Sequence, residues 1–172
     1  MGAFFTALAR FIDRVNGAIG RAVAWTALAL VLVQFVVVVL RYVFGVGSII
    51  LQESLVYLFG TLFMLGAGYT LWRNGHVRVD VFYRDASPRR KAWVDALGVI
   101  LFLWPMCAVL WVMAEPYVAG SWAVREGSRE TSGIPAIYLL KTEILVFIGL
   151  MALQGLSLLI HSVATIAGER RP

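Results

Sequence analysis

The sequence predicts an all-α membrane protein with four transmembrane helices, an N-terminal amphipathic helix and both termini in the cytoplasm. Hydrophobic residues make up 60% of the 172-residue chain and charged residues only 15%, whereas a soluble domain averages about 25% charged residues. The apolar residues are concentrated in four long blocks, which charged stretches separate. The basic residues stand at the edges of these blocks, where they orient a protein in a membrane.

The first twenty residues, 1–20, differ from the rest of the chain. Apolar residues recur there at helical spacing, and charged or polar residues interrupt the pattern, namely Arg10, Asp13, Arg14 and Asn16. This pattern is typical of an amphipathic helix that lies at a membrane surface. The alternative is that these residues simply extend the first membrane helix.

Residues 21–172 form the predicted transmembrane domain. A helix needs about 20 apolar residues to cross the bilayer core. Long uncharged stretches run from Ala22 to Leu40, from Ser54 to Trp72, from Ala96 to Ala114 and from Ile144 to Gly168. With the helix-start signals included, we expect spans at about 22–40, 54–72, 92–114 and 137–167.

Local signals refine these bounds. Ser87-Pro88 is typical of an N-cap followed by proline in the first helical turn, so the third helix is expected to begin near Pro88. Pro105 falls inside that helix and predicts a kink. Asn74-Gly75 predicts a turn after the second helix.

The distribution of lysine and arginine predicts the orientation. The N-terminal arm, the second loop and the tail carry three, six and two of them, eleven in all, and the other two loops carry four. The positive-inside rule places the richer set in the cytoplasm. The net charge of +5 therefore serves orientation, and we expect membrane lipids but no nucleic acid as partners.

The uncharged cores argue against a transporter that works alone. They contain no Asp, Glu, Lys or Arg, whereas such carriers usually keep ionisable groups inside the membrane. Gln34 and Gln154 are expected to join helices by hydrogen bonds, and His161 is the ionisable imidazole of the fourth core. The single Cys107 leaves no CxxC motif. We therefore predict no catalytic, cofactor-binding or metal-binding residue, and no enzyme.

The loops hold the remaining candidate residues, all expected to be structural or interfacial. Arg41 and Glu53 flank the first loop and are close enough in sequence to pair across it. The second loop contains a charged cluster, and the third contains charges beside a large aromatic residue, which suits a docking surface. Solvated loop charges are the alternative for each. The second-loop cluster consists of His76, Arg78 and Asp80. The third-loop group consists of Trp122, Glu126 and Lys141.

Together, these segments resemble the small membrane subunit (DctQ-like) of tripartite ATP-independent periplasmic (TRAP) transporters. The matching stretches are LRYVF, LQES, GHVRVD, SWAVREGS with SGIP, and YLLK followed by Gln154-Gly155. Their order and their places relative to four spans carry the resemblance. The chain is most similar to the mannitol/chloroaromatic-type subgroup.

The resemblance implies a scaffold subunit in the bacterial inner membrane. It would pair, as a heterodimer, with a separate large TRAP membrane subunit that carries sodium and substrate sites. A periplasmic substrate-binding protein would deliver an organic acid. Two alternatives remain from other classes. One is a self-sufficient four-helix carrier, and the other is a haem- or quinone-binding membrane subunit that uses His76 and His161.

Overall fold

The protein is described by a computed structural model that covers residues 2–77 and 83–168. Those residues form helices joined by turns and loops, with no strand among them. Four helical segments are long and apolar enough to cross a membrane, as the sequence predicts: Phe4–Tyr42, Ile49–Trp72, Pro88–Ala123 and Ile137–Ile166. Each of them overlaps one of the four expected spans.

The first helix is one continuous element. Helix α1 (Ala3–Tyr42) has 40 residues and is therefore about 60 Å long at 1.5 Å per residue. The arm is thus continuous with the first membrane helix from Ala3 onward. Ala9, Ile12 and Asn16 of this arm are buried against the rest of the protein. Its location at a membrane surface stays a prediction.

Helix α2 (Ile49–Trp72) returns antiparallel to α1 after a short loop. The hydroxyl of Ser48 caps its N-terminus by accepting a hydrogen bond from the backbone N–H of Leu51. The loop turns at Gly45, whose φ of 66° favours glycine. The predicted turn after α2 is also present, with Asn74 at a φ of 53°. Asparagine tolerates this conformation better than most residues.

The third membrane segment contains a π-helical turn shortly before Pro105. Helix α3 (Pro88–Gly98) begins as expected, with the Ser87 hydroxyl accepting from the backbone N–H of Arg90. A π-helical turn (Val99–Leu103) follows, and helix α4 (Trp104–Ala123) continues the chain. Pro105 has no N–H to donate to the preceding turn, and it lies in the first turn of α4, directly after the π-helical turn. The kink expected at Pro105 stays a prediction.

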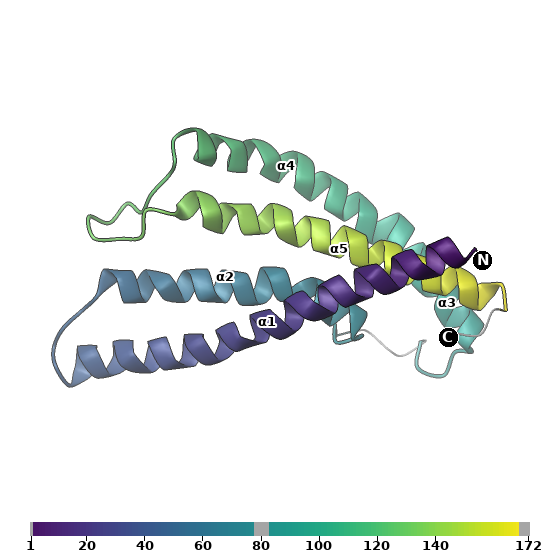
Figure 1. The fold of residues 1–172 in the computed structure, drawn as a ribbon, viewed down its shortest axis with the longest axis horizontal. Coiled ribbons are helices and arrows are strands. Elements are labelled where there is room, and N and C mark those ends of the chain that lie inside the picture. The colour runs from purple at the N-terminus through teal and green to yellow at the C-terminus, as the bar shows by residue number, and fades with distance from the viewer. Residues whose placement is uncertain (1, 78–82, 169–172) are drawn as a thin grey trace.

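Helix α5 (Ile137–Ile166) is the element that holds the bundle together. It packs against α1, α2, α3 and α4, whereas α1 and α4 make no contact with each other. Figure 1 shows the α1–α2 hairpin on one side of α5 and α4 on the other. The start of α1, the end of α2, the start of α3 and the end of α5 lie together, and we call this the terminal end. The loops 43–48 and 124–136 lie at the opposite end.

Glycines allow several of these close contacts, as expected for helices in a membrane. A Cβ built on Gly20 of α1 would lie 2.2 Å from the Tyr69 ring of α2, and one on Gly155 of α5 would lie 2.7 Å from Leu103. Gly68 likewise faces Asn16. Two other helical glycines, Gly66 of α2 and Gly149 of α5, have open space beside them. These two positions are therefore not used for close packing among the described residues.

Replacing Gly20 with alanine is expected to loosen the α1–α2 hairpin. The added methyl group meets the Tyr69 side chain, and overpacking typically costs about 1–3 kcal/mol. Gly149→Ala is the matched control, because it gives the same gain in helix propensity without a neighbour. Thermal unfolding in detergent measures both. A Gly20→Ala midpoint equal to that of the control contradicts the packing.

Candidate functional site

Polar side chains gather at both ends of the bundle. At the terminal end, one cluster joins α1 to α5. At the opposite end, a second set of polar side chains attaches the 124–136 loop to the helices. Polar contacts between membrane helices are usually structural, but they also mark pathways and interfaces. The geometry of each set decides what it can do.

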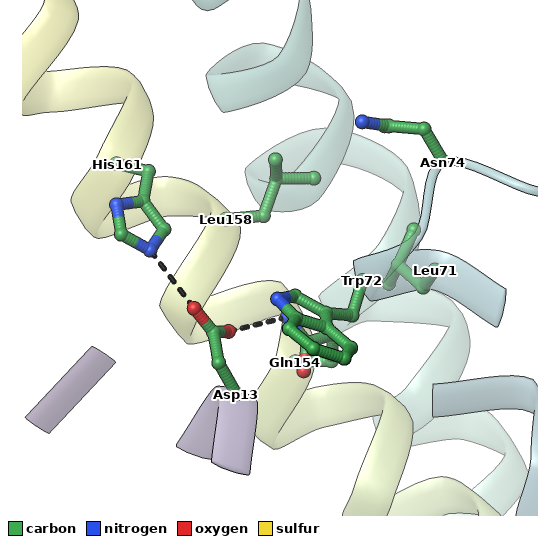
Figure 2. Close-up of a pocket in the computed structure, with 7 residues that line it drawn as sticks. All are labelled: Asp13, Leu71, Trp72, Asn74, Gln154, Leu158 and His161. Atoms are coloured by element: carbon green, nitrogen blue, oxygen red, sulfur yellow. Dashed lines mark hydrogen bonds and ion pairs between the residues drawn. The ribbon is translucent and has the colours of Figure 1, made fainter. Parts of the chain in front are cut away.

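The terminal-end cluster is centred on the Asp13 carboxylate, and we call it the Asp13 cluster. Asp13 Oδ1 accepts hydrogen bonds from Ser157 Oγ at 2.6 Å and from Gln154 Nε2 at 3.0 Å. Asp13 Oδ2 lies 3.1 Å from His161 Nε2. Asn16 Nδ2 completes the cluster by donating to Gln154 Oε1 at 2.9 Å. Figure 2 shows the Asp13 carboxylate between His161 and Gln154.

Helical spacing brings these residues together. Gln154, Ser157 and His161 occur at i, i+3 and i+7 on α5, and Asp13 and Asn16 at i and i+3 on α1. Ser157 and Asn16 are almost completely buried, at 0% and 1% exposed. The cluster is therefore a set of polar groups that bond to one another between two helices, although the buried Asn16 Oδ1 has no hydrogen-bond partner among the described residues. The expected role of Gln154 in joining helices agrees with these contacts.

A small cavity adjoins the Asp13 cluster. It has a volume of about 170 Å³ and is lined by Asp13, Leu71, Trp72, Asn74, Gln154, Leu158 and His161. Pockets for small-molecule ligands usually measure about 300–1,000 Å³. Both oxygens of Asp13 are already engaged by α5. This arrangement favours a structural polar junction rather than a substrate site.

At the opposite end, Glu53 anchors the long loop. Its carboxylate accepts hydrogen bonds from Ser128 Oγ and from the backbone N–H of Ile134, the latter at 2.6 Å. The pairing of Arg41 with Glu53 that the sequence suggested is not formed. Arg41 Nη2 instead donates to Gln52 Oε1 at 3.2 Å, because Glu53 faces the 124–136 loop.

A second group ties the same loop to α4 and α5. Lys141 Nζ lies 2.5 Å from Glu126 Oε2, which also accepts from Ser121 Oγ at 2.8 Å. These donors, Lys141 first, lower the pKa of Glu126 below its ordinary value. Lys141 Nζ also lies 3.9 Å from the centroid of the Tyr117 ring, a cation–π geometry.

Trp122 completes this set. Its indole Nε1 donates to Thr142 Oγ1 at 2.8 Å, and its ring packs against Tyr138. Glu126 and Lys141 are thus paired with each other, whereas Trp122 contacts Thr142 and Tyr138. The structure gives each of them an intramolecular contact, and a docking role stays a prediction.

Sequence reasoning overlooked a carboxylate in the fourth membrane segment. The expected span at 137–167 includes Glu143, but only the uncharged stretch from Ile144 was considered as the membrane core. Glu143 lies in the second turn of α5 and accepts a hydrogen bond from Thr61 of α2 at 2.5 Å. A start signal at Pro135 would have placed Glu143 inside the helix, and the structure shows that its side chain faces α2. Glu143 thus adds a second polar junction, between α2 and α5.

The charged cluster of the second loop is only partly described. His76 is exposed in the turn that follows α2. Arg78 and Asp80 lie outside the described residues. His161, the other histidine, contacts Asp13. Within residues 2–77 and 83–168, no group of three or more His, Cys, Asp or Glu side chains is arranged to hold a metal ion.

Comparison with known families identifies the chain. Residues 30–165 match the model of the DctQ component of tripartite ATP-independent periplasmic transporters. The match covers most of the sequence. The chain belongs to this family. No curated protein and no solved structure matches the chain.

Membership of the DctQ family makes the chain a multi-pass membrane component of a transporter rather than an enzyme. The family match begins at residue 30, within α1. The α1 half of the Asp13 cluster therefore lies outside the matched segment, whereas its α5 half lies inside. Both loop contacts at the opposite end, through Glu53 and Glu126, also lie inside it.

Replacing Asp13 with alanine is expected to lower the free energy of unfolding by about 1–3 kcal/mol. The change leaves Gln154, Ser157 and His161 without their shared acceptor, and hydrogen bonds between membrane helices contribute about 0.6 kcal/mol each on average, more when a buried partner is orphaned. Thermal unfolding in detergent measures the loss. Asp85→Ala, at an exposed loop carboxylate, is the control. Additive effects of Asp13→Ala and His161→Ala in a double-mutant cycle exclude the direct contact.

The Glu126 contacts predict that the protein becomes less stable at acid pH, as the anchor of the 124–136 loop is lost. The pKa of Glu126 is lower in the folded protein than its ordinary 4.5. Its contribution to stability is therefore complete above that value and disappears as the pH falls below it. The unfolding midpoint of Glu126→Gln should be lower at pH 7 and should depend less on pH below 4.5. Glu130→Gln is the control, because Glu130 is exposed on the same loop. If the unfolding midpoints of Glu126→Gln and of the unmodified chain fall in parallel as the pH is lowered, Glu126 does not contribute in this way.

Proposed function

We propose that the chain is the small scaffold subunit of a sodium-coupled secondary transporter that takes up an organic acid. In this proposal it supports a large membrane subunit, and a periplasmic binding protein delivers the substrate. The family match supports the role, because components of this family work with both of those partners. The mannitol/chloroaromatic-type subgroup, an inner-membrane location and cytoplasmic termini are part of the same proposal.

Gln34 is the observation that best supports a membrane partner. It lies 18 residues after Asn16, which is five helical turns, and therefore on the same face of α1. At the terminal end that face packs on α5 through Asn16. Gln34 itself is exposed and has no hydrogen-bond partner among the described residues. An amide left unpaired in the hydrocarbon core is costly.

The surroundings of Gln34 indicate the kind of surface that would cover it. Val31, Phe35 and Val38 beside it are exposed at 61%, 65% and 41%. Lipid can cover apolar side chains, but it offers no hydrogen-bond partner to an amide. We infer that a polar group of the large subunit pairs with Gln34. An interface between membrane subunits provides both kinds of contact.

The opposite end suits the docking of a binding protein. The 124–136 loop is held by Glu53 and by the Lys141–Glu126 pair, so it presents a fixed surface rather than a flexible one. Arg125, Arg129 and Glu130 are exposed on that loop. Charged groups on a rigid loop favour specific, salt-sensitive association.

Co-purification tests the scaffold role and the Gln34 contact together. The tagged chain, extracted in mild detergent from cells that express the large subunit, should retain that subunit in stoichiometric amount. Gln34→Leu should retain less, about threefold for a hydrogen bond worth about 0.6 kcal/mol. Val112→Leu, at an exposed apolar site on α4, is the control. Equal retention by both variants contradicts the Gln34 interface.

Uptake distinguishes the scaffold from a self-sufficient carrier. Proteoliposomes that contain the chain alone should show no sodium-dependent uptake, and those that contain both membrane subunits and the binding protein should show it. Transport by the chain alone would overturn the proposal. A Soret band in the purified chain would favour the haem-binding alternative.

A further inference from the structure

Three arginines form a stripe along the first part of α1. Arg10, Arg14 and Arg21 stand at i, i+4 and i+11, and Gly17 occupies the intervening i+7 position. These spacings fall on one face of an α-helix. All three arginines are exposed. The stripe is therefore a row of cations on a single face at the terminal end.

A cavity lies along this stripe, and the three arginines line it. Its volume is about 290 Å³, and its lining residues are Arg10, Asp13, Arg14, Gly17, Arg21 and Trp72. Trp72, the last residue of α2, forms the wall opposite α1. Its ring packs so closely on Gly17 that an added Cβ would lie 2.9 Å from it. The cavity is thus built by two helices and is not a simple gap beside one.

The positive charge of this cavity is not neutralised within the described residues. The one acidic lining residue, Asp13, directs both carboxylate oxygens to Ser157, Gln154 and His161 of α5. None of the three arginines has an ion pair in the described part of the chain, and Arg10 donates only to the backbone oxygen of Thr6. Arg73 adds a further cation 5.5 Å from the centroid of the Trp72 ring. The site therefore favours an anion.

The position of the cavity relative to the hydrocarbon core indicates which class of anion it binds. The uncharged stretch of α1 begins at Ala22, directly after Arg21. Arg14 lies about 10 Å further along the helix at 1.5 Å per residue. Headgroup phosphates lie just outside the hydrocarbon core, in the layer where tryptophans such as Trp72 are also enriched. Arg14 and Arg21 can therefore reach the phosphate layer.

The same face continues into the hydrocarbon layer as an apolar track. Trp25, Leu28 and Leu32 follow Arg21 at i+4, i+7 and i+11, and they are exposed at 72%, 51% and 55%. Acyl chains of a lipid whose phosphate lies at Arg21 would run along these side chains. A free phosphate ion would leave the track uncovered. This track lies about a third to a half of a turn away from the Gln34 face, at 100° per residue.

We propose that this cavity binds the phosphate of an anionic phospholipid, with Arg14 and Arg21 as its ligands and Trp72 as its wall. Arg10 and Arg73 add positive charge around the headgroup. Basic pockets between membrane helices bind anionic lipid headgroups in this way. The site is independent of the transport role and of the membrane partner, because only residues of this chain form it.

Lipid titration of the full chain in detergent tests the site. Phosphatidylglycerol should raise the unfolding midpoint and should remain bound in native mass spectrometry, and phosphatidylcholine should do neither. Arg14→Gln combined with Arg21→Gln should weaken phosphatidylglycerol binding by about thirtyfold, since each arginine near an anionic surface contributes about fivefold. Without added lipid, the unfolding midpoint of this variant should not change, because neither side chain has an ion pair among the described residues.

Two control variants separate binding in the cavity from general charge attraction and from misfolding. Arg89→Gln combined with Arg90→Gln removes two exposed arginines at the start of α3, outside the cavity, and should retain binding. Arg14→Lys combined with Arg21→Lys keeps the charge and should retain most of it, which covers the case in which the glutamine variant does not fold. Equal loss in the Arg89/Arg90 variant would show general charge attraction and overturn the site. Inorganic phosphate that competes as well as phosphatidylglycerol would overturn the lipid assignment.

Discussion

The architecture depends on the absence of water from the bilayer core, where each polar group must find its partner within protein. Helix α5 meets part of this requirement for its neighbours, although Asn16 Oδ1, Tyr57 Oη and Glu143 Oε2 are buried without a partner among the described residues. It supplies Gln154, Ser157 and His161 to Asp13 of α1, and Glu143 to Thr61 of α2. Few side chains in this bundle are fully buried, so apolar packing within the chain alone provides a limited core. Polar junctions therefore define how the helices meet.

Much of the fold follows from hydropathy and from local signals. Four long apolar blocks have no folded alternative to membrane helices, and Ser87-Pro88 begins α3 where capping chemistry predicts. The π-helical turn at Val99–Leu103 was not predicted, because no local signal in those apolar residues distinguishes it from ordinary α-helix.

The polar contacts were harder to predict because they join distant parts of the chain. Asp13 and Asn16 interrupt an apolar pattern, and a pattern read along α1 alone places them in solvent. Their partners lie about 140 residues away on α5, and only the helix arrangement reveals them. Glu53 was assigned to Arg41 for a similar reason, since nearness in sequence favours local pairs over contacts with the 124–136 loop. Gln154 was easier, because an amide in an apolar stretch needs a partner wherever that partner lies.

The central place of α5 has a consequence for how the protein is made. Chains are synthesised from the N-terminus, so the helix that contacts all the others leaves the ribosome after them. Until α5 enters the bilayer, the α1–α2 hairpin and the α3–α4 segment have no contact with each other, and Asp13 lacks its partners. Biogenesis therefore passes through two separate, incomplete pieces. Truncation before α5 would leave both pieces as substrates for membrane quality control.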